Sequence, residues 1–242
     1  MKKQENNWDY GGVTICFLGD SVTQGCFELF LKQNGEIETH YDQRSTYHSY
    51  VARILSSLYP SVPVNIINAG ISGGNAPHGA LRLEKDVLKY HPDLCVVCFG
   101  LNDVMNGMDG LSAYTKALTD IFVALKNAGI ETIFMTPNMM NTEISVHLER
   151  ETPRKVAKET MTAQMEGIMD AYINAAIEVC EKNGVVICDC YSRWKKLSDA
   201  GVNTTNLLAN HINHPTREMN WLFAVSLIET MLEIKNDLEE KK

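Results

Sequence analysis

Hydrophobic positions along the chain fall into short continuous runs separated by longer segments of helical spacing. The runs are rich in Val, Ile, Leu, Phe and Cys, have the length of buried strands, and cover 13–18, 64–69, 94–99, 132–136 and 185–189. Apolar residues that recur every three or four positions predict helices over 45–58, 77–90, 112–127, 162–182 and 215–235. The run 94–99 has no polar residue, which is typical of a strand buried on both faces of a parallel sheet.

Strands and helices alternate five times, with no Pro/Gly/Ser-rich linker and no repeat between them. This pattern predicts an α/β fold: a three-layer α/β/α, flavodoxin-like sandwich with a five-stranded parallel sheet, in a single domain over 1–242. Ligands of such sheets bind beyond the carboxyl ends of the strands, so the loops after the first three strands should meet at one site. The polar segments 28–44 and 139–158 predict a surface excursion and a mobile flap near that site.

Composition narrows the function classes. The chain has 242 residues, 45% hydrophobic and 21% charged, with a formal net charge of −8, which argues against a nucleic-acid partner. No apolar segment approaches the ~20 residues needed to span a bilayer, and the first ten residues lack the core of a signal peptide. We therefore expect a cytoplasmic protein with no membrane partner. Cys95 and Cys98 have metal-ligand spacing, but in a strand they point to opposite faces, so we expect no metal or redox site there. We expect no cofactor.

Candidate chemistry begins where the first predicted strand ends. Ser21 follows Gly19-Asp20 at that turn, where a serine offers an exposed hydroxyl as nucleophile and a backbone N–H as oxyanion donor. A serine that only caps a helix or turn is the alternative interpretation. The three glycines in 70–75, after the second strand, allow a backbone N–H to approach a ligand closely or simply form a tight turn.

Two further segments carry polar groups. Asn102 follows the most apolar strand and has an amide NH₂ that could reach an oxyanion beside Ser21, or could cap the next turn. His211 and His214 stand three apart before the last helix, with no obvious third metal ligand. A neutral histidine there can serve as the general base of a serine.

Together these segments resemble the four sequence blocks of the SGNH hydrolases, also called GDSL-type esterases, in the family's order and over nearly the whole chain. Gly19-Asp20-Ser21, Asn68 to Gly73, Gly100-Leu101-Asn102-Asp103 and the segment ending His214-Pro215 match them. The resemblance implies that Ser21 is the nucleophile and His214 its base. It also implies an oxyanion hole of the Ser21 and Gly73 N–H groups and the Asn102 side chain. We interpret Asp20 and Asp103 as hydrogen-bond acceptors that fix their loops.

One position departs from the family pattern. Three residues before the base the family usually has Asp, which orients the imidazole and stabilises its charged form; here that residue is His211. Either a backbone carbonyl, Asn210, Asn213 or water orients His214, or a distant carboxylate substitutes, or activity is weak.

The expected function is that of a serine ester hydrolase, acting through an acyl-serine intermediate on a small-molecule ester. The mostly polar predicted loops favour a short acyl ester, such as acetyl, of a polar alcohol such as a carbohydrate. A thioesterase or lysophospholipase for longer acyl chains stays open, as does a non-catalytic binding protein that retains the fold, which the missing Asp favours. No phosphate-loop spacing with its lysine is present to support a nucleotide binder. The sequence leaves a homo-oligomer open.

Overall fold

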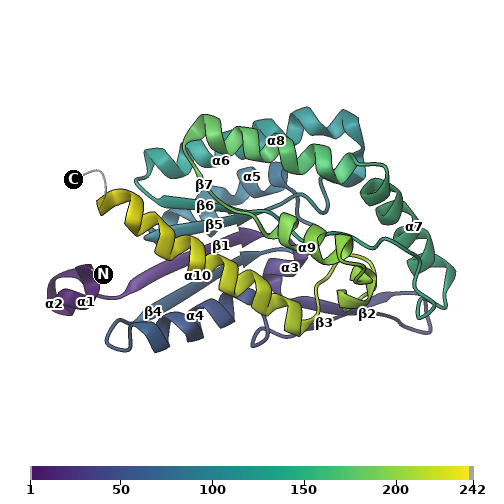
Figure 1. Ribbon diagram of the computed structural model, residues 1–242, viewed down its shortest axis with the longest axis horizontal. Helices are drawn as coiled ribbons and strands as arrows, with labels where there is room; N and C mark the ends of the chain where they lie inside the picture. The colour runs from purple at the N-terminus through teal and green to yellow at the C-terminus, as the bar shows by residue number, and fades with distance from the viewer. Residues whose placement is uncertain (1, 240–242) are drawn as a thin grey trace.

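The computed structural model describes residues 2–239, and a five-stranded parallel sheet forms its centre (Figure 1). The strands are β1 (Val13–Gly19), β4 (Val64–Gly70), β5 (Leu94–Cys98), β6 (Glu131–Met135) and β7 (Val186–Cys188), in the spatial order β4-β1-β5-β6-β7. Numbered along the chain, these strands run 2-1-3-4-5, the flavodoxin-like order of doubly wound sheets. The predicted fold class is therefore confirmed.

Helices cover both faces of this sheet (Figure 1). α4 (Tyr47–Leu58) and α10 (Arg217–Glu239) pack together on one face. The other face carries α5 (Ala76–Asp86), α6 (Leu111–Asn127) and α8 (Ile168–Asn183). The short elements of the chain are α1 (Lys2–Glu5), α2 (Asn7–Tyr10), α3 (Ser21–Gln24), η1 (Leu88–Tyr90), η2 (Val104–Asn106), η3 (Met108–Gly110) and η4 (Thr204–Leu207).

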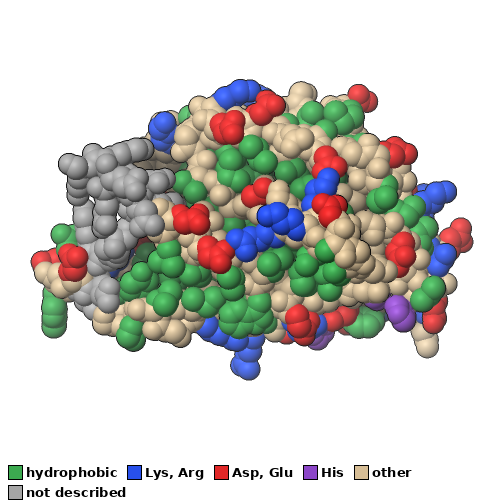
Figure 2. All heavy atoms as spheres, viewed as in Figure 1, with side chains coloured by type: hydrophobic (Ala, Val, Ile, Leu, Met, Phe, Trp, Pro, Cys, Tyr) green, Lys and Arg blue, Asp and Glu red, His purple; other side chains and the backbone are tan. Residues whose placement is uncertain are grey.

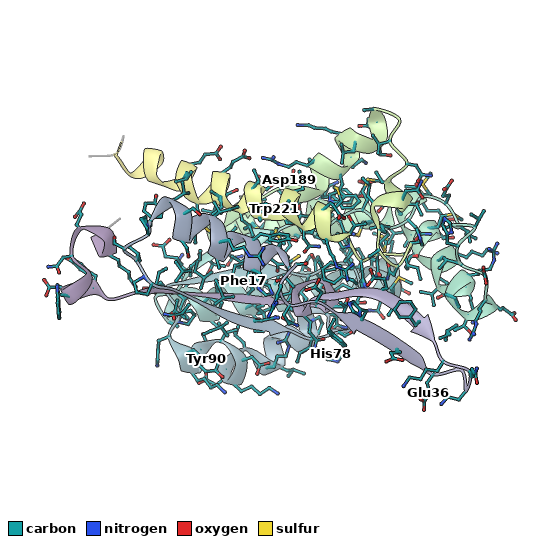
Figure 3. The ribbon with its side chains drawn as sticks, turned by 90° about the horizontal axis from the view of Figure 1, so that it is seen from below. Phe17, Glu36, His78, Tyr90, Asp189 and Trp221 are labelled. Carbon is teal, nitrogen blue, oxygen red and sulfur yellow. The ribbon has the colours of Figure 1, made fainter. Side chains whose placement is uncertain are left out.

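The core lies where the central strands meet both helical layers. In Figure 3, Phe17 of β1 lies between Trp221 of α10 on one side and Tyr90 of η1 on the other. Phe17, Cys95 and Val96 have no exposed surface, as the unbroken apolar pattern of these strands predicts.

Some hydrophobic side chains remain at the surface over α4 and α10, where Figure 2 shows them gathered on one face. Leu58, Trp221 and Val225 are each at least 40% exposed. A homo-oligomer stays a prediction.

Within residues 2–239, no helix is both long enough and apolar enough to cross a bilayer.

The polar segment after α3 is a β-hairpin that sequence periodicity does not reveal. β2 (Cys26–Leu31) and β3 (Ile37–Tyr41) pair antiparallel as a separate two-stranded sheet. Figure 3 shows Glu36 at the far end of this hairpin, away from the central sheet. Most described side chains beyond Phe27 in the hairpin are partly or fully exposed, so the strands lack a clear apolar alternation.

The segment 139–158, predicted to be a mobile flap, is buried at its start and helical at its end, and its mobility stays a prediction. Met139, Met140 and Asn141 are buried, and α7 (Glu151–Met165) begins within the segment. The Asn141 amide donates to the carbonyls of Glu143 and Ala157, so its polarity is satisfied internally. The helix predicted over 162–182 is the end of α7 followed by α8, because Gly167 adopts φ +79° between them. α9 (Cys190–Asp199) then follows β7.

Candidate active site

Ser21 is the first residue of α3, directly after β1, and only 4% of its surface is exposed. Asp20 caps this short helix, because its Oδ1 accepts from the Val22 N–H at 2.9 Å. The turn requires glycine at position 19. A Cβ there would overlap Thr23 Oγ1 and come within 2.9 Å of the Cys98 carbonyl oxygen. The sequence thus fixes a tight strand-to-helix turn that presents the serine hydroxyl at the carboxyl edge of the sheet.

The glycine loop after β4 lies against this turn. The Ile71 N–H donates to the Gly19 carbonyl at 3.2 Å, and the Ser72 N–H donates to Gln24 Oε1 at 2.6 Å. Gly73 has φ +72° with open space where a Cβ would stand. In the described part of the chain its N–H has no acceptor, and neither has that of Ser21. Both groups are therefore free to bind a ligand.

The loop after β5 forms hydrogen bonds with the glycine loop and with the start of α5. Asn102 Nδ2 donates one of its two hydrogens to the Gly74 carbonyl at 2.8 Å, and the other has no acceptor among the described residues. Asp103 Oδ1 accepts from the Ala76 N–H at 2.9 Å, which joins this loop to the start of α5. Burial raises the pKa of Asp20 to about 7 and that of Asp103 to about 6. Both carboxyl groups contact backbone N–H groups, as expected of loop-fixing acceptors.

Asn210 and Asn213 shape the loop that carries His214. Asn210 Oδ1 accepts from the backbone N–H groups of Ile212, Asn213 and His214 at 2.9–3.0 Å. Its amide donates to Asn213 Oδ1, and Asn138 donates to the Asn213 carbonyl. Neither Asn210 nor Asn213 contacts the His214 ring through its side chain; the Asn210 side chain binds the loop backbone, and the Asn213 side chain binds Asn210.

His214 joins the serine to the hairpin. Its Nε2 lies 2.9 Å from Ser21 Oγ, and its Nδ1 lies 2.9 Å from the Phe27 carbonyl oxygen. Because a carbonyl can only accept, Nδ1 carries the proton and Nε2 is the acceptor for the serine hydroxyl. Among the orienting groups left open by the sequence, the structure places a backbone carbonyl against Nδ1. Only 4% of the His214 surface is exposed.

His211 lies elsewhere. Its ring stacks on that of His147, with centroids 5.1 Å apart, and its backbone adopts φ +54°. Its Nδ1 is buried without a hydrogen-bond partner among the described residues. The residue at the position of the family's Asp therefore makes no recorded contact with the His214 ring.

The protonation state of His214 follows from its surroundings. Burial lowers its pKa below the usual 6.5, while the hydrogen bond to Phe27 and the negative charge of Glu28 oppose that effect. The imidazole is thus neutral at pH 7 and able to accept a proton.

Sequence reasoning missed two contributors to this geometry. Every residue has a carbonyl, so nothing in the sequence distinguishes that of Phe27. Arg82 is buried and donates to the carbonyls of Gly19 and Ala69, which holds the ends of β1 and β4 together. A lone arginine among the apolar positions of a helix was the only available signal for it.

Comparisons with known proteins identify proteins of the same fold and the family of the chain. Solved structures of an acetylxylan esterase from Geobacillus stearothermophilus and of an alpha/beta hydrolase enzyme from the metagenome of Lake Arreo, Spain, share the fold. Their TM-scores are 0.66 and 0.67, and each match covers 90% of this chain and 94% of the other at 20% identity.

A curated acetylxylan esterase from Geobacillus stearothermophilus is 29% identical over 136 residues, which are 52% of this chain and 60% of that relative's length. The model of the GDSL-like lipase/acylhydrolase family matches residues 17–222. The resemblance first seen in four sequence blocks is thereby confirmed: the chain belongs to the GDSL-like lipase/acylhydrolase family.

Proposed function

We propose that the chain hydrolyses carboxylic esters through an acyl-serine intermediate. The observation that carries this proposal is the contact between His214 Nε2 and Ser21 Oγ, with the Nδ1 proton held by a carbonyl. His214 removes the proton from Oγ as Oγ attacks the ester carbonyl. His214 then protonates the departing alcohol, and water releases the acyl group by the reverse path.

The tetrahedral oxyanion needs donors that are free before substrate binds. The N–H groups of Ser21 and Gly73 and the second amide hydrogen of Asn102 meet this requirement. Each such donor is typically worth ~3 kcal/mol of transition-state stabilisation. We assign these three groups to the oxyanion hole.

Labelling with a fluorophosphonate tests the proposal, because only an activated serine reacts with it. The wild-type protein should be labelled on the peptide that contains Ser21, and the His214→Asn variant should react far more slowly. Absence of labelling in a folded sample would favour the alternative of a binding protein that retains the fold.

The pH dependence of hydrolysis should reflect the buried base. Because burial lowers the pKa of His214, the neutral form persists to lower pH than for a free imidazole. We expect the acidic limb of the kcat/KM profile to have its midpoint below pH 6.5. Rates for p-nitrophenyl acetate between pH 4 and 8, measured where the protein stays folded, check this. A midpoint above pH 7 would contradict the assigned base.

For the substrate we propose a short acyl ester, an acetate, of a polar alcohol such as a carbohydrate. Support comes from the curated relative, which is named as an acetylxylan esterase, and from the polar residues of the loops around Ser21. The panel that tests this compares acetylated sugars with p-nitrophenyl esters of increasing chain length.

One cavity favours a second candidate, a hydrolase for longer acyl chains. It has a volume of about 340 Å³ and lies between the hairpin, the start of α7 and the loop that carries His214. Its apolar walls include Leu29, Leu148, Val156 and Ile212. An acyl chain buried there would gain ~0.8 kcal/mol, about fourfold in kcat/KM, for each added CH₂.

Filling this cavity separates the two candidates. We expect acetyl esters to be preferred over octanoyl esters and Val156→Trp to leave the rates for acetyl esters unchanged. The matched control is Val123→Trp, because Val123 is 43% exposed against 40% for Val156 and lies on α6, outside the cavity. A preference for octanoyl esters that Val156→Trp abolishes and Val123→Trp preserves would instead establish the longer-chain activity.

A further inference from the structure

The hairpin supplies the group that orients His214, yet it does not belong to the central sheet. The Phe27 carbonyl lies on β2, which among the strands of residues 2–239 pairs only with β3. A two-stranded hairpin alone is marginally stable in water. Keeping the carbonyl within 2.9 Å of Nδ1 therefore requires contacts between the hairpin and the segment that carries the histidine.

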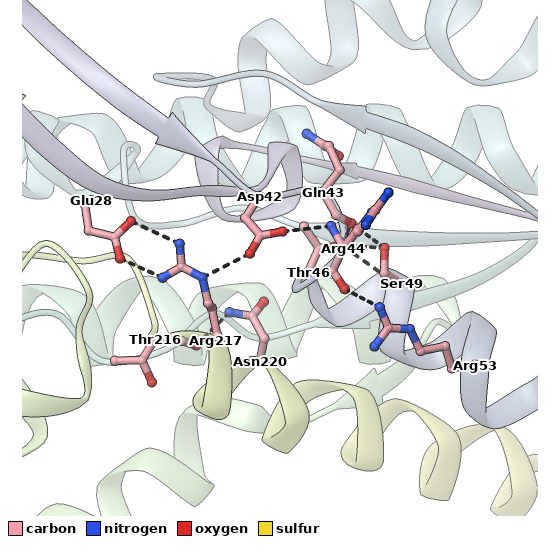
Figure 4. Close-up of polar contacts among 10 residues, drawn as sticks. All are labelled: Glu28, Asp42, Gln43, Arg44, Thr46, Ser49, Arg53, Thr216, Arg217 and Asn220. Atoms are coloured by element: carbon pink, nitrogen blue, oxygen red, sulfur yellow. Dashed lines mark hydrogen bonds and ion pairs between the residues drawn. The ribbon is translucent and has the colours of Figure 1, made fainter.

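Arg217 makes those contacts (Figure 4). Its guanidinium donates to both carboxylate oxygens of Glu28, at 2.6 and 3.2 Å, and through Nε to Asp42 Oδ2 at 3.0 Å. It also lies over the Phe27 ring, 4.4 Å from the centroid. One side chain thus touches the residue that orients the base, the residue next to it, and the residue that follows β3.

Arg217 is close in sequence to the proposed base, and its partner Glu28 is close in sequence to the orienting carbonyl. Arg217 is three residues after His214, and Glu28 directly follows Phe27. Arg217, Glu28 and Asp42 form what we call the Arg217 clamp. Its two carboxylates and one guanidinium leave one net negative charge, and the field of Glu28 acts on His214.

We propose that Arg217 is a positioning residue for the reaction and that the Arg217 clamp performs the two tasks of the missing triad acid. It holds the Phe27 carbonyl against His214 Nδ1, and its Glu28 carboxylate places negative charge on the residue next to the one that orients the imidazole. This inference rests on the proposed esterase function.

An ordinary exposed ion pair would not behave in this way. Such pairs are worth ~0–1 kcal/mol of stability and leave catalysis unaffected. The clamp differs because its side chains are only 26–31% exposed, its Arg–Glu contact is bidentate, and the guanidinium packs on a buried aromatic ring. Hydrogen bonding with Arg217 lowers the pKa of Glu28, so this carboxylate stays ionised near neutral pH.

Steady-state kinetics with p-nitrophenyl acetate test the clamp. We expect Arg217→Gln and Glu28→Gln to lower kcat about 10- to 100-fold, the range for a catalytic group displaced by about 1 Å, with little change in KM. Arg217→Lys, which keeps the charge without the bidentate fork, should be intermediate. The matched control is Arg193→Gln, which breaks the Arg193–Glu229 pair between α9 and α10 and should keep the wild-type kcat.

A readout independent of turnover is the tautomer of His214, observed by NMR of ¹⁵N-histidine-labelled protein and assigned with His214→Asn. Wild type should hold the proton on Nδ1, and Arg217→Gln should shift it toward a mixture with Nε2. Wild-type kcat and an unchanged tautomer in Arg217→Gln would overturn the clamp, while loss of activity in Ser21→Ala would still support the esterase. If the wild-type protein lacks esterase activity, the proposed function fails. The effect of Arg217→Gln on the His214 tautomer then tests by itself whether Arg217 positions the imidazole.

Discussion

Replacement of Ser21 by alanine is expected to lower kcat for p-nitrophenyl acetate by about 10⁴-fold or more, within the range seen when a serine nucleophile is removed from a serine hydrolase. The reason is that, in the proposed mechanism, Oγ forms the acyl bond, and within the described chain no other hydroxyl lies within hydrogen-bond distance of His214 Nε2. Residual activity would come from the oxyanion donors and binding alone. Initial rates at saturating substrate, with purified protein, measure the effect.

The control for this variant is Ser57→Ala. Ser57 is an exposed serine of α4 whose hydroxyl donates to the Arg53 carbonyl, so its loss should leave kcat unchanged. Thermal melting should show both variants folded. Full turnover by Ser21→Ala would mean that the nucleophile lies elsewhere and would refute the proposed mechanism.

The second large effect is expected at one of two histidines only three positions apart. His214→Asn should lower kcat by about 10⁴-fold or more, because it removes the base, whereas His211→Asn should change kcat less than about threefold. Asparagine suits the comparison because it tolerates the left-handed backbone of His211, where φ is +54°.

Paired kinetics and melting curves of the two variants measure this difference. The stacked pair of His211 and His147 predicts at most a small loss of stability for His211→Asn. Equal loss of activity in both variants would mean that His211 takes part in catalysis.

The sequence predicts the central sheet well because its physical signal is strong. A strand buried on both faces, such as 94–99, must be apolar throughout, and glycine turns mark where the strands end. The flavodoxin-like class also follows, since connections in parallel sheets leave few topologies.

The sequence did not predict the elements whose polar residues either bond to nearby backbone groups or face solvent. Asn138 and Asn141 are buried, but their amides bond to backbone carbonyls, so the segment resembles a surface loop in sequence. The hairpin carries exposed polar residues on most of its length, which conceals its strands.

The groups of the candidate site also differ in how well the sequence predicts them. Residues that we propose to act through side chains, such as Ser21, Asn102 and His214, could be nominated from their type and position. The orienting carbonyl of Phe27 could not, because a backbone group has no sequence signature. Arg217 and Glu28 are 189 residues apart, and no local pattern connects them.

The separation of Ser21 and His214 by 193 residues has a consequence for biosynthesis. The Ser21 hydroxyl leaves the ribosome 193 residues before the His214 imidazole, so during synthesis the proposed nucleophile has no base until the segment around His214 has folded against it. Recovery of esterase activity during refolding should accordingly lag behind formation of the sheet. Its rate would then measure how fast the segment around His214 docks.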